Sequence, residues 1–510
     1  MTHDAWLLLA VASTPFFLVG YLLSVPDALS YVLLLSVVVH VCRGDGYVEI
    51  AIDCFSLLAM VITETMLDLR SMDRLKRSVI FAVVFMAMYP VCFYYSARPV
   101  ECLLTCMFAS ASFTGHWVLV SSKEYTIAEQ ALLDIELSKY PHLSGAISRV
   151  AGLNTLSVTS SKSSSCADDK NTSAKCAAAA ISKDRKKGLQ VQKEILVLLH
   201  GYGGGNVLWA QSFSILAAKY DVHCVELPGM GNSDRPNWQH WEPNQVLNQF
   251  QEKLELWRQT MGIGSFVLLG HSLGALAASS YTVRYNNRVS SLVLVSPVGV
   301  APRSSKTPLN HGPSRMLTGS FLARFGGWLW EQHLGPLDLL RAFGPLAHTA
   351  ISTVLDSKVN RSSGRSHLRK ASKEDLALTC AYLHQNWCQK PSGERAITVL
   401  LAPGAWPRLP LCNWLRVAGH TSGHSSFNGF DEGALSHLGP GIGKDCSVSF
   451  IYGDPKNDWM DKSGGDELAA DLRRQGCKAQ CTFVHDAGHL VNLDQPYTFA
   501  EMVLQVLNEK

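Results

Sequence analysis

Six short apolar segments beyond residue 193 alternate with stretches of helical pattern, and this alternation limits the folds open to the chain. The segments are rich in β-branched residues and leucine, and they lie at residues 195–199, 222–227, 266–269, 292–295, 448–452 and 482–484. Strands that alternate with helices form a parallel sheet covered by helices on both faces. The sequence therefore predicts an α/β domain over residues 191–510. Helix-like pieces with Gly and Pro at residues 303–445 predict a cap inserted into the sheet, where substrate choice would reside.

The first 122 residues have a different character. Four uncharged apolar stretches lie at residues 6–25, 28–42, 79–97 and 103–120. The first is about 20 residues long, which is the length a helix needs to cross a bilayer. We therefore expect residues 1–122 to form a membrane region of about four transmembrane helices. Residues 47–67 carry three acids, each costly inside a bilayer, so this segment is expected at the interface.

The topology follows from the basic residues at positions 70–77, because loops rich in Lys and Arg stay in the cytoplasm. With four spans, the catalytic region also faces the cytoplasm, and the candidate membranes are the endoplasmic reticulum and the lipid droplet. Two glycosylation sequons, at Asn171 and Asn360, would suit a luminal domain, but such tripeptides arise easily by chance.

Two segments join the membrane region to the α/β domain. Thr126 and Glu129 form a T-x-x-E capping box before a series of apolar positions, which predicts an amphipathic linker helix within residues 123–156. Residues 157–190 are mostly Ser, Lys and Ala, with too little bulky apolar content to offset the entropy of ordering. This second segment is expected to be a flexible tether.

Charge and cysteine content exclude several classes of function. The chain has 45 basic and 42 acidic residues and a net charge of +3, without the basic stripe that nucleic acids select. The 14 cysteines form no C-x-x-C pair and no repeating Cys/His spacing typical of zinc sites, and a reduced environment suits them. We expect no nucleic-acid partner, no metal and no cofactor.

The segment FVLLGHSLGALAASSY places an apolar strand directly before the G-x-S-x-G motif at residues 270–274 and an alanine-rich helix directly after it. This is the context in which the motif forms a nucleophile elbow. The turn is so tight that Gly270 and Gly274 must lack side chains, while the oxygen of Ser272 is exposed at the start of the helix. Ser272 is therefore the predicted nucleophile.

A serine hydroxyl needs a base to take its proton, and the base needs an acid to orient it. In this type of fold the three follow the order Ser, Asp, His. His489 follows D-A-G at the end of the last strand and is the predicted base. Two acids follow the preceding strand in YGDPKNDWM: Asp458 is the favoured triad acid, and Asp454 is the alternative, with a structural role in a turn as its other interpretation.

The first strong strand ends in the Gly-rich loop HGYGGG, which includes His200, Gly201 and Gly203. Flexible glycines let backbone amides face a developing oxyanion, and the expected donors are the amides of Tyr202 and Leu273. The loop lacks the G-x-x-x-x-G-K-[ST] pattern of nucleotide-binding loops, which argues against a phosphate-binding role.

These motifs occur with more specific sequence blocks. Residues 128–508 resemble the α/β-hydrolase-domain-containing protein 4 and 5 subfamily through VLLHGYGGGNVLWAQSF, ELPGMGNSDRP, NQFQEKLELWRQTMGI, LLGHSLGALAASSY, GPLDLLRAFGPL, PSGERA and AGHLVNLDQP, in that order. The resemblance implies the α/β-hydrolase fold and activity on acylated glycerophospholipids. One branch resembles lysophospholipases. The other resembles lipase coactivators with proposed lysophosphatidate acyltransferase activity and carries Asn in place of Ser272.

The resemblance also implies an H-x4-D acyltransferase motif formed by His489 and Asp494. The chain departs from the family pattern in its N-terminal membrane region, its Ser-rich tether and a YGDPKNDWM segment that is longer by about two residues. We expect a membrane-bound serine hydrolase that cleaves carboxylic esters of lipids. The alternatives are a lysophosphatidate acyltransferase and a non-catalytic lipase coactivator, and in each case the partners are a lipid substrate and a membrane.

Overall fold

The computed structural model describes residues 120–161, 193–237, 242–302, 321–342, 346–361, 372–420 and 438–509. The expected membrane region lies outside these residues except for its last three, and so does most of the expected tether. Among the helices of the described ranges, none combines the length and the apolar character that a bilayer crossing requires. The chain divides into two compact units, and the larger one, residues 120–339 and 351–510, contains the sheet and the candidate site.

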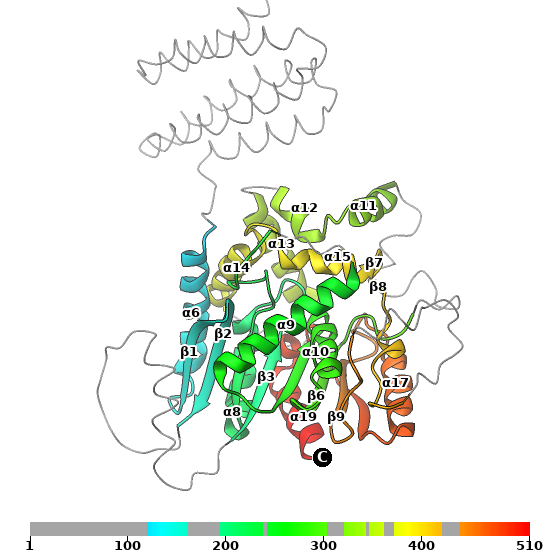
Figure 1. The fold of residues 1–510 in the computed structure, drawn as a ribbon. Coiled ribbons are helices and arrows are strands. Elements are labelled where there is room, and N and C mark those ends of the chain that lie inside the picture. Colours follow the sequence, from blue (N-terminus) through cyan, green and yellow to red (C-terminus); the bar gives the residue numbers. More distant parts are fainter. Residues whose placement is uncertain are drawn as a thin grey trace, which may run out of the picture. The chain divides into compact units, whose positions relative to one another are not determined.

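An eight-stranded sheet forms the centre of this unit (Figure 1). Its strands are β1 (Leu143–Val150), β2 (Leu153–Ser160), β3 (Glu194–Leu199), β4 (Tyr220–Val225), β5 (Phe266–His271), β6 (Val289–Val295), β9 (Ser447–Gly453) and β10 (Ala479–Val484). Their order in space is β1-β2-β4-β3-β5-β6-β9-β10. Strands β4, β3, β5, β6, β9 and β10 pair in parallel, as the alternating pattern predicted, and all six expected strands are present.

Helices cover both faces of the sheet, so that the central strands are buried on either side (Figure 1). Helix α9 (Pro243–Met261) packs on α10 (Leu273–Arg284), and α8 (Phe213–Lys219) packs on α19 (Pro496–Asn508). Helix α17 (Lys462–Arg474) covers β9 and β10. Large side chains such as Trp257 and Tyr281 are fully buried between these layers. Each buried apolar side chain of this size contributes roughly 1.5–3 kcal/mol of transfer free energy.

The expected linker helix over residues 123–156 is wrong in its second half. Helix α6 covers only Ser122–Ser138, and strands β1 and β2 follow it as an antiparallel hairpin. The chain reverses at Ala151 and Gly152, where φ is positive (+51° and +83°), a conformation that favours a tight turn. Because β2 pairs antiparallel with β4, the hairpin extends the sheet, and the α/β domain begins well before residue 191.

The start of α6 also differs from the expected capping box. Ser121 is the N-cap, and its hydroxyl accepts a hydrogen bond from the amide of Glu124 at 3.1 Å. Thr126 instead lies inside the helix, where its hydroxyl donates to the carbonyl of Ser122. A serine at the N-cap satisfies one of the amides that the first helical turn leaves unpaired, so the N-cap lies at Ser121, upstream of the Thr126 that the T-x-x-E pattern indicated.

The chain between β6 and β9 contains the helices of the expected cap. In the described residues they are α11 (Phe321–Glu331), α12 (Pro336–Ala342), α13 (Leu346–Arg361), α14 (Lys373–Trp387) and α15 (Ala396–Leu400), followed by the short strands β7 (Leu401–Ala402) and β8 (Trp406–Pro407). This inserted part contacts the sheet domain at the loop after β4. There the amide of Gly393 donates to the carbonyl of Gly229 at 3.1 Å, and Arg235 forms a buried 3.0 Å ion pair with Glu394.

Candidate active site

Ser272 lies at the sharp turn between β5 and α10. Its backbone has φ +54° and ψ −115°, a strained conformation for a residue with a side chain. Strain of this kind costs about 1–3 kcal/mol and persists only where the surroundings enforce it. The amide of Ser272 donates to the carbonyl of Val295 at 2.9 Å, which ties the turn to the end of β6. The turn predicted from G-x-S-x-G is present.

The two glycines of the motif occupy positions where a Cβ atom cannot fit. A Cβ atom on Gly270 would overlap the backbone carbonyl of Gly274, and one on Gly274 would lie 2.5 Å from the carbonyl oxygen of His200. Such distances are well below van der Waals contact. Both glycines therefore let β5, α10 and the Gly-rich loop after β3 approach one another around Ser272.

The structure brings together three predicted residues from distant parts of the chain. His489 Nε2 lies 3.1 Å from Ser272 Oγ, and His489 Nδ1 lies 3.3 Å from Asp458 Oδ1. All three residues follow parallel strands at their carboxyl ends, namely β5, β9 and β10. The distances match those of a serine nucleophile, a general base and the acid that orients it.

Asp458 lies in an environment that stabilises its ionised form. Burial alone would raise its pKa, but hydrogen bonding to His489, the nearby charge of that ring and donation from Ser296 together hold the pKa of Asp458 below its ordinary value. The Ser296 hydroxyl donates to Oδ2 at 2.6 Å, and the amides of Gly453 and Met460 donate at 2.9 and 3.0 Å. A carboxylate held in this way can stabilise an imidazolium at His489.

The alternative acid, Asp454, has a different setting. Its carboxylate accepts hydrogen bonds from the amides of Lys456 at 3.0 Å and Asp486 at 3.3 Å, and these bonds lower its pKa. Its nearest histidine is His485, at 3.9 Å. Asp454 thus fixes the turns after β9 and β10, and the structure places Asp458, not Asp454, against His489.

The Gly-rich loop between β3 and α8 is held in place by His200. The amide of Leu227 donates to His200 Nε2 at 3.1 Å, so the ring proton lies on Nδ1, which donates to the carbonyl of Gly201 at 2.7 Å. Burial lowers the pKa of His200 to about 4, so the ring is neutral at pH 7. A Cβ atom on Gly201 would lie 2.9 Å from Ser272 Cβ, which places the loop directly beside the serine.

The cap binds the same loop from the other side. Trp387 Nε1 at the end of α14 donates to the carbonyl of Gly203 at 2.6 Å, and the backbone of Gly203 is left-handed (φ +66°). The Tyr202 hydroxyl accepts a 3.0 Å hydrogen bond from the amide of Leu337 on α12. Leu273 is the first residue of α10, so its amide has no acceptor within that helix. The loop is therefore anchored on both sides next to Ser272.

Three residues at the site were not singled out from the sequence. Ser296 follows β6, has φ +38° and holds Asp458. The Nε2 atom of His271 donates to the carbonyl of His489 at 2.9 Å, and burial, followed by the nearby His489, lowers the pKa of His271 to about 3. The ring of Trp459 packs on that of His489 with 4.3 Å between centroids. Each of the three follows a strand directly or adjoins a predicted site residue in the sequence. That position is the feature from which they could have been predicted.

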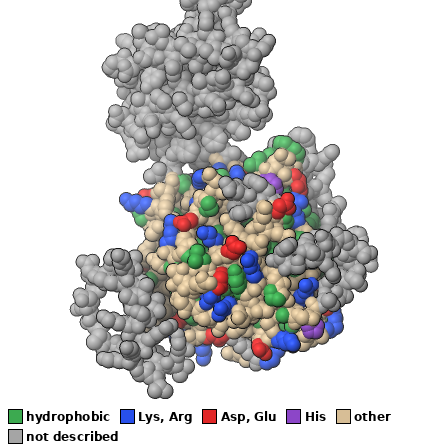
Figure 2. Space-filling model, in the orientation of Figure 1, with side chains coloured by type: hydrophobic (Ala, Val, Ile, Leu, Met, Phe, Trp, Pro, Cys, Tyr) green, Lys and Arg blue, Asp and Glu red, His purple; other side chains and the backbone are tan. Residues whose placement is uncertain are grey.

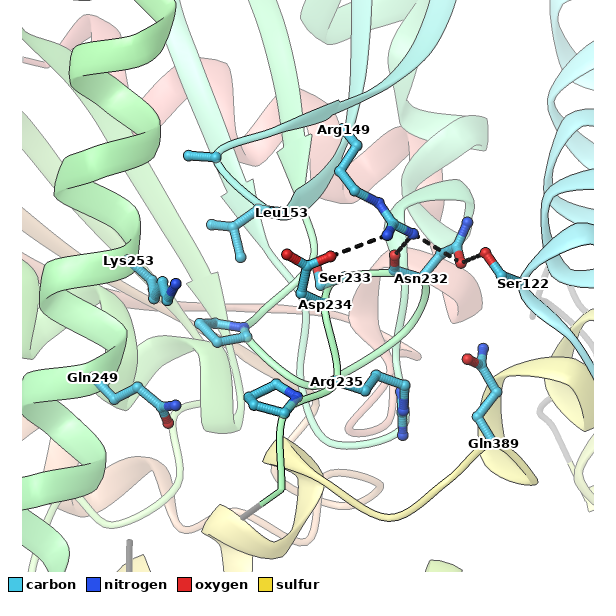
Figure 3. A pocket seen from close by; sticks show the side chains of 14 residues that line it. Ser122, Arg149, Leu153, Asn232, Ser233, Asp234, Arg235, Gln249, Lys253 and Gln389 are labelled. Atoms are coloured by element: carbon cyan, nitrogen blue, oxygen red, sulfur yellow. Dashed lines mark hydrogen bonds and ion pairs between the residues drawn. The ribbon is translucent and has the colours of Figure 1, made fainter. Parts of the chain in front are cut away.

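A cavity of about 510 Å³, lined in part by the loop after β4, lies apart from these residues (Figure 3). Its lining includes Arg149, Asp234, Arg235 and Lys253. The Arg149 guanidinium donates to Asp234 at 3.0 Å and to the Asn232 carbonyl at 2.5 Å, in a partly exposed ion pair. Ser272, His489 and Asp458 do not line this cavity.

Comparison with known proteins identifies the family to which the chain belongs. Residues 194–337 match a family model described as alpha/beta hydrolase fold. The chain is 29% identical over 321 residues to (lyso)-N-acylphosphatidylethanolamine lipase of Mus musculus, covering 62% of this chain and 80% of that protein. It is 31% identical over 313 residues to 1-acylglycerol-3-phosphate O-acyltransferase ABHD5 of Sus scrofa, covering 61% and 76%. The chain belongs to the α/β-hydrolase-domain-containing protein 4 and 5 subfamily.

Solved structures similar to this chain include a membrane phospholipase A, with 16% identity and a TM-score of 0.46 over 76% of this chain and 93% of that one. The two relatives named above carry different activities in their names, a lipase and an acyltransferase. Membership of the subfamily therefore establishes an α/β hydrolase related to lipid enzymes.

Proposed function

We propose that this protein is a serine hydrolase that cleaves carboxylic esters of lipids. The observation that carries the proposal is the arrangement of Ser272, His489 and Asp458, with 3.1 and 3.3 Å between the successive side chains. A lipid ester as substrate is supported by the two relatives, which are named as a lipase for N-acyl phospholipids and an acyltransferase for acylglycerol phosphates.

In this mechanism His489 Nε2 accepts the proton of Ser272 Oγ as that oxygen attacks the ester carbonyl carbon. The carbonyl π electrons move to oxygen, and the amides of Tyr202 and Leu273 donate to this oxyanion. Collapse of the intermediate breaks the bond to the alcohol, which takes the proton from His489 Nε2. Water then attacks the acyl-serine in the same manner, releasing the fatty acid and restoring the Ser272 hydroxyl. Asp458 stabilises the imidazolium in both halves.

The proposal is tested with a fluorophosphonate probe and a lipid ester on the full chain in detergent. We expect the wild type to be labelled and Ser272→Ala to lose both labelling and turnover, by several orders of magnitude in kcat. Ser280→Ala is a matched control, since Ser280 is a buried serine on the same helix, α10. Turnover by Ser272→Ala at a tenth or more of the wild-type rate would refute the proposal.

A lysophosphatidate acyltransferase is the second candidate, because the Sus scrofa relative bears that name and Asp494 follows His489 at the H-x4-D spacing. In that reaction His489 would deprotonate the acceptor hydroxyl, which would attack the thioester of acyl-CoA and release CoA without using Ser272. Purified variants given acyl-CoA and lysophosphatidate separate the two. Phosphatidate formed at the wild-type rate by Ser272→Ala, but not by Asp494→Asn, would favour the transferase.

The proposed location is a membrane, with residues 1–122 as anchor and the hydrolase domain in the cytoplasm. An anchor suits a substrate that is poorly soluble in water. Protease digestion of sealed microsomes is expected to cleave the segment at residues 157–190, and Asn171 and Asn360 are expected to carry no glycan. An endoglycosidase-sensitive mass shift, or protection of that segment, would place the domain on the luminal side.

A further inference from the structure

Asp494 has a structural setting that the hydrolase mechanism does not use. It is the last residue of the short helix α18 (Val491–Asp494) and is buried. Its Oδ2 accepts a 2.8 Å hydrogen bond from the amide of Gly488, the residue directly before His489. A buried carboxylate that accepts an amide proton fixes that backbone group strongly, because the bond is charge-assisted. Asp494 therefore acts on the segment that carries the histidine.

The backbone around Gly488 is confined on its other side as well. A Cβ atom on Gly453, at the end of β9, would overlap the carbonyl oxygen of Gly488. A Cβ atom on Gly488 would lie only 3.0 Å from Asp494 Oδ2. The segment before His489 is thus held between the end of β9 and the carboxylate of Asp494.

The cap contacts the same carboxylate. Lys358 on α13 places its Nζ atom 3.8 Å from Asp494 Oδ1, while the Asp494 side chain is 6% exposed. A carboxylate at this depth requires hydrogen bonds or a counter-charge, and Lys358 supplies positive charge from the inserted helices. One oxygen of Asp494 therefore faces the His489 segment and the other faces the cap.

Both ring nitrogens of His489 are already engaged, by Ser272 and by Asp458. We propose that Asp494 is a positioning residue that sets the His489 ring through the Gly488 amide, and that Lys358 links the seating of the cap to this position. The inference rests on the proposed hydrolase function. It gives the H-x4-D spacing a role in ester hydrolysis that requires no transferase chemistry.

The experiment compares Asp494→Ala, Asp494→Asn and Lys358→Met in the full chain, using a soluble p-nitrophenyl ester. Asparagine keeps an oxygen that can accept from Gly488, whereas alanine does not. Asp466→Ala and Lys462→Met are the matched controls, because these two residues form a 2.6 Å ion pair within α17. Thermal unfolding of each variant verifies that it is folded.

We expect Asp494→Ala to lower kcat by about tenfold to a hundredfold, the loss that follows when a catalytic group is misplaced by about 1 Å, with little change in KM. Asp494→Asn should retain most of the wild-type kcat. The kcat of Lys358→Met should lie between those of Asp494→Asn and Asp494→Ala. Both controls should match the wild type. Wild-type kcat in Asp494→Ala, or an equal loss in Asp466→Ala, would overturn the positioning role, and wild-type kcat in Lys358→Met would overturn the link to the cap.

A second readout does not depend on activity. Diethyl pyrocarbonate modifies accessible imidazoles, and peptide mass spectrometry can compare His489 with His485, whose side chains are 11% and 81% exposed. We expect the ratio of His489 to His485 modification to rise in Asp494→Ala and Lys358→Met and to stay unchanged in the controls. If Ser272→Ala keeps its turnover, the hydrolase proposal fails, while this ratio still decides the positioning role. An unchanged ratio in Asp494→Ala would refute it.

Discussion

The hydroxyl of Tyr125 on α6 lies 2.8 Å from the hydroxyl of Tyr382 on α14, deep in the interior. Tyr125 also donates to the Glu226 carboxylate, so its single proton is used there and Tyr382 is the donor to Tyr125. Glu226 follows β4 and accepts further bonds from the amides of Asn206 (3.2 Å) and Asn232 (2.7 Å). The first described helix, the sheet and the cap therefore meet in one buried polar network.

Replacing Tyr125 or Tyr382 by phenylalanine removes one hydroxyl and tests which of the two tyrosines donates to the other. We expect Tyr125→Phe to destabilise the domain by about 1–3 kcal/mol, because it leaves the buried Glu226 carboxylate with one donor fewer. Tyr382→Phe should cost less, about 1 kcal/mol, since Tyr125 keeps Glu226 as its partner. Urea unfolding in detergent measures both. A greater loss of stability in Tyr382→Phe than in Tyr125→Phe would contradict this order of donors.

Glu129 belongs to the same network, because the Asn154 side-chain amide donates to both Glu129 and Glu226, and it predicts a pH dependence of stability. The pKa of Glu129 is raised well above its ordinary value, first by burial and then by the charge of Glu226. A carboxyl group whose folded pKa exceeds its unfolded pKa contributes stability that is present below the unfolded pKa and lost as pH rises through the folded pKa. Glu129→Gln should therefore become increasingly stable relative to the wild type as pH increases from 5 to 8.

Urea unfolding at several pH values tests this prediction. The control is Asp134→Asn, which alters an exposed residue on the same helix. It should shift stability by a similar amount at each pH. Parallel stability curves for Glu129→Gln and the wild type would show that Glu129 does not bind a proton in this range on folding.

Replacing each of the two candidate acids, Asp458 and Asp454, by asparagine should give different kinetic results. Asp458→Asn should lower kcat by about 10³- to 10⁴-fold, as loss of the orienting carboxylate does in serine proteases. Asp454→Asn should keep most activity, because that carboxylate accepts bonds from the turn amides of Lys456 and Asp486. Turnover of a soluble ester by each variant provides the measurement. A larger loss in Asp454→Asn would assign the acid to the other position.

Contact between cap and sheet domain depends on Gly393. A Cβ atom at this position would overlap the carbonyl oxygen of Pro228, whereas a Cβ atom on Gly264 would have nothing within 4 Å. We expect Gly393→Ala to destabilise the protein by about 1–3 kcal/mol, the usual cost of overpacking, and Gly264→Ala to be close to neutral. The midpoints of urea unfolding compare the two, and equal midpoints would mean that the cap shifts without cost.

Local patterns were sufficient for much of the architecture and for the nucleophile. The six parallel strands have continuous apolar runs, because a parallel sheet is buried on both faces. Ser272 could be predicted because its strand, its turn and its helix are consecutive in sequence. The hairpin at residues 143–160 was missed because its alternating apolar residues follow directly on the pattern of α6. Its pairing with β4 joins segments that lie far apart in the chain.

By itself, the sequence determined the order of the six parallel strands, the elbow around Ser272 and the position of His489 after the last strand, because each depends on neighbouring residues. Only the tertiary structure decided between Asp458 and Asp454, which lie in one segment and differ in which of them faces His489. It also decided the contacts of Ser296 with Asp458 and of Lys358 with Asp494. These pairs form where separate strands and the cap converge, and the packing of the whole domain sets that convergence.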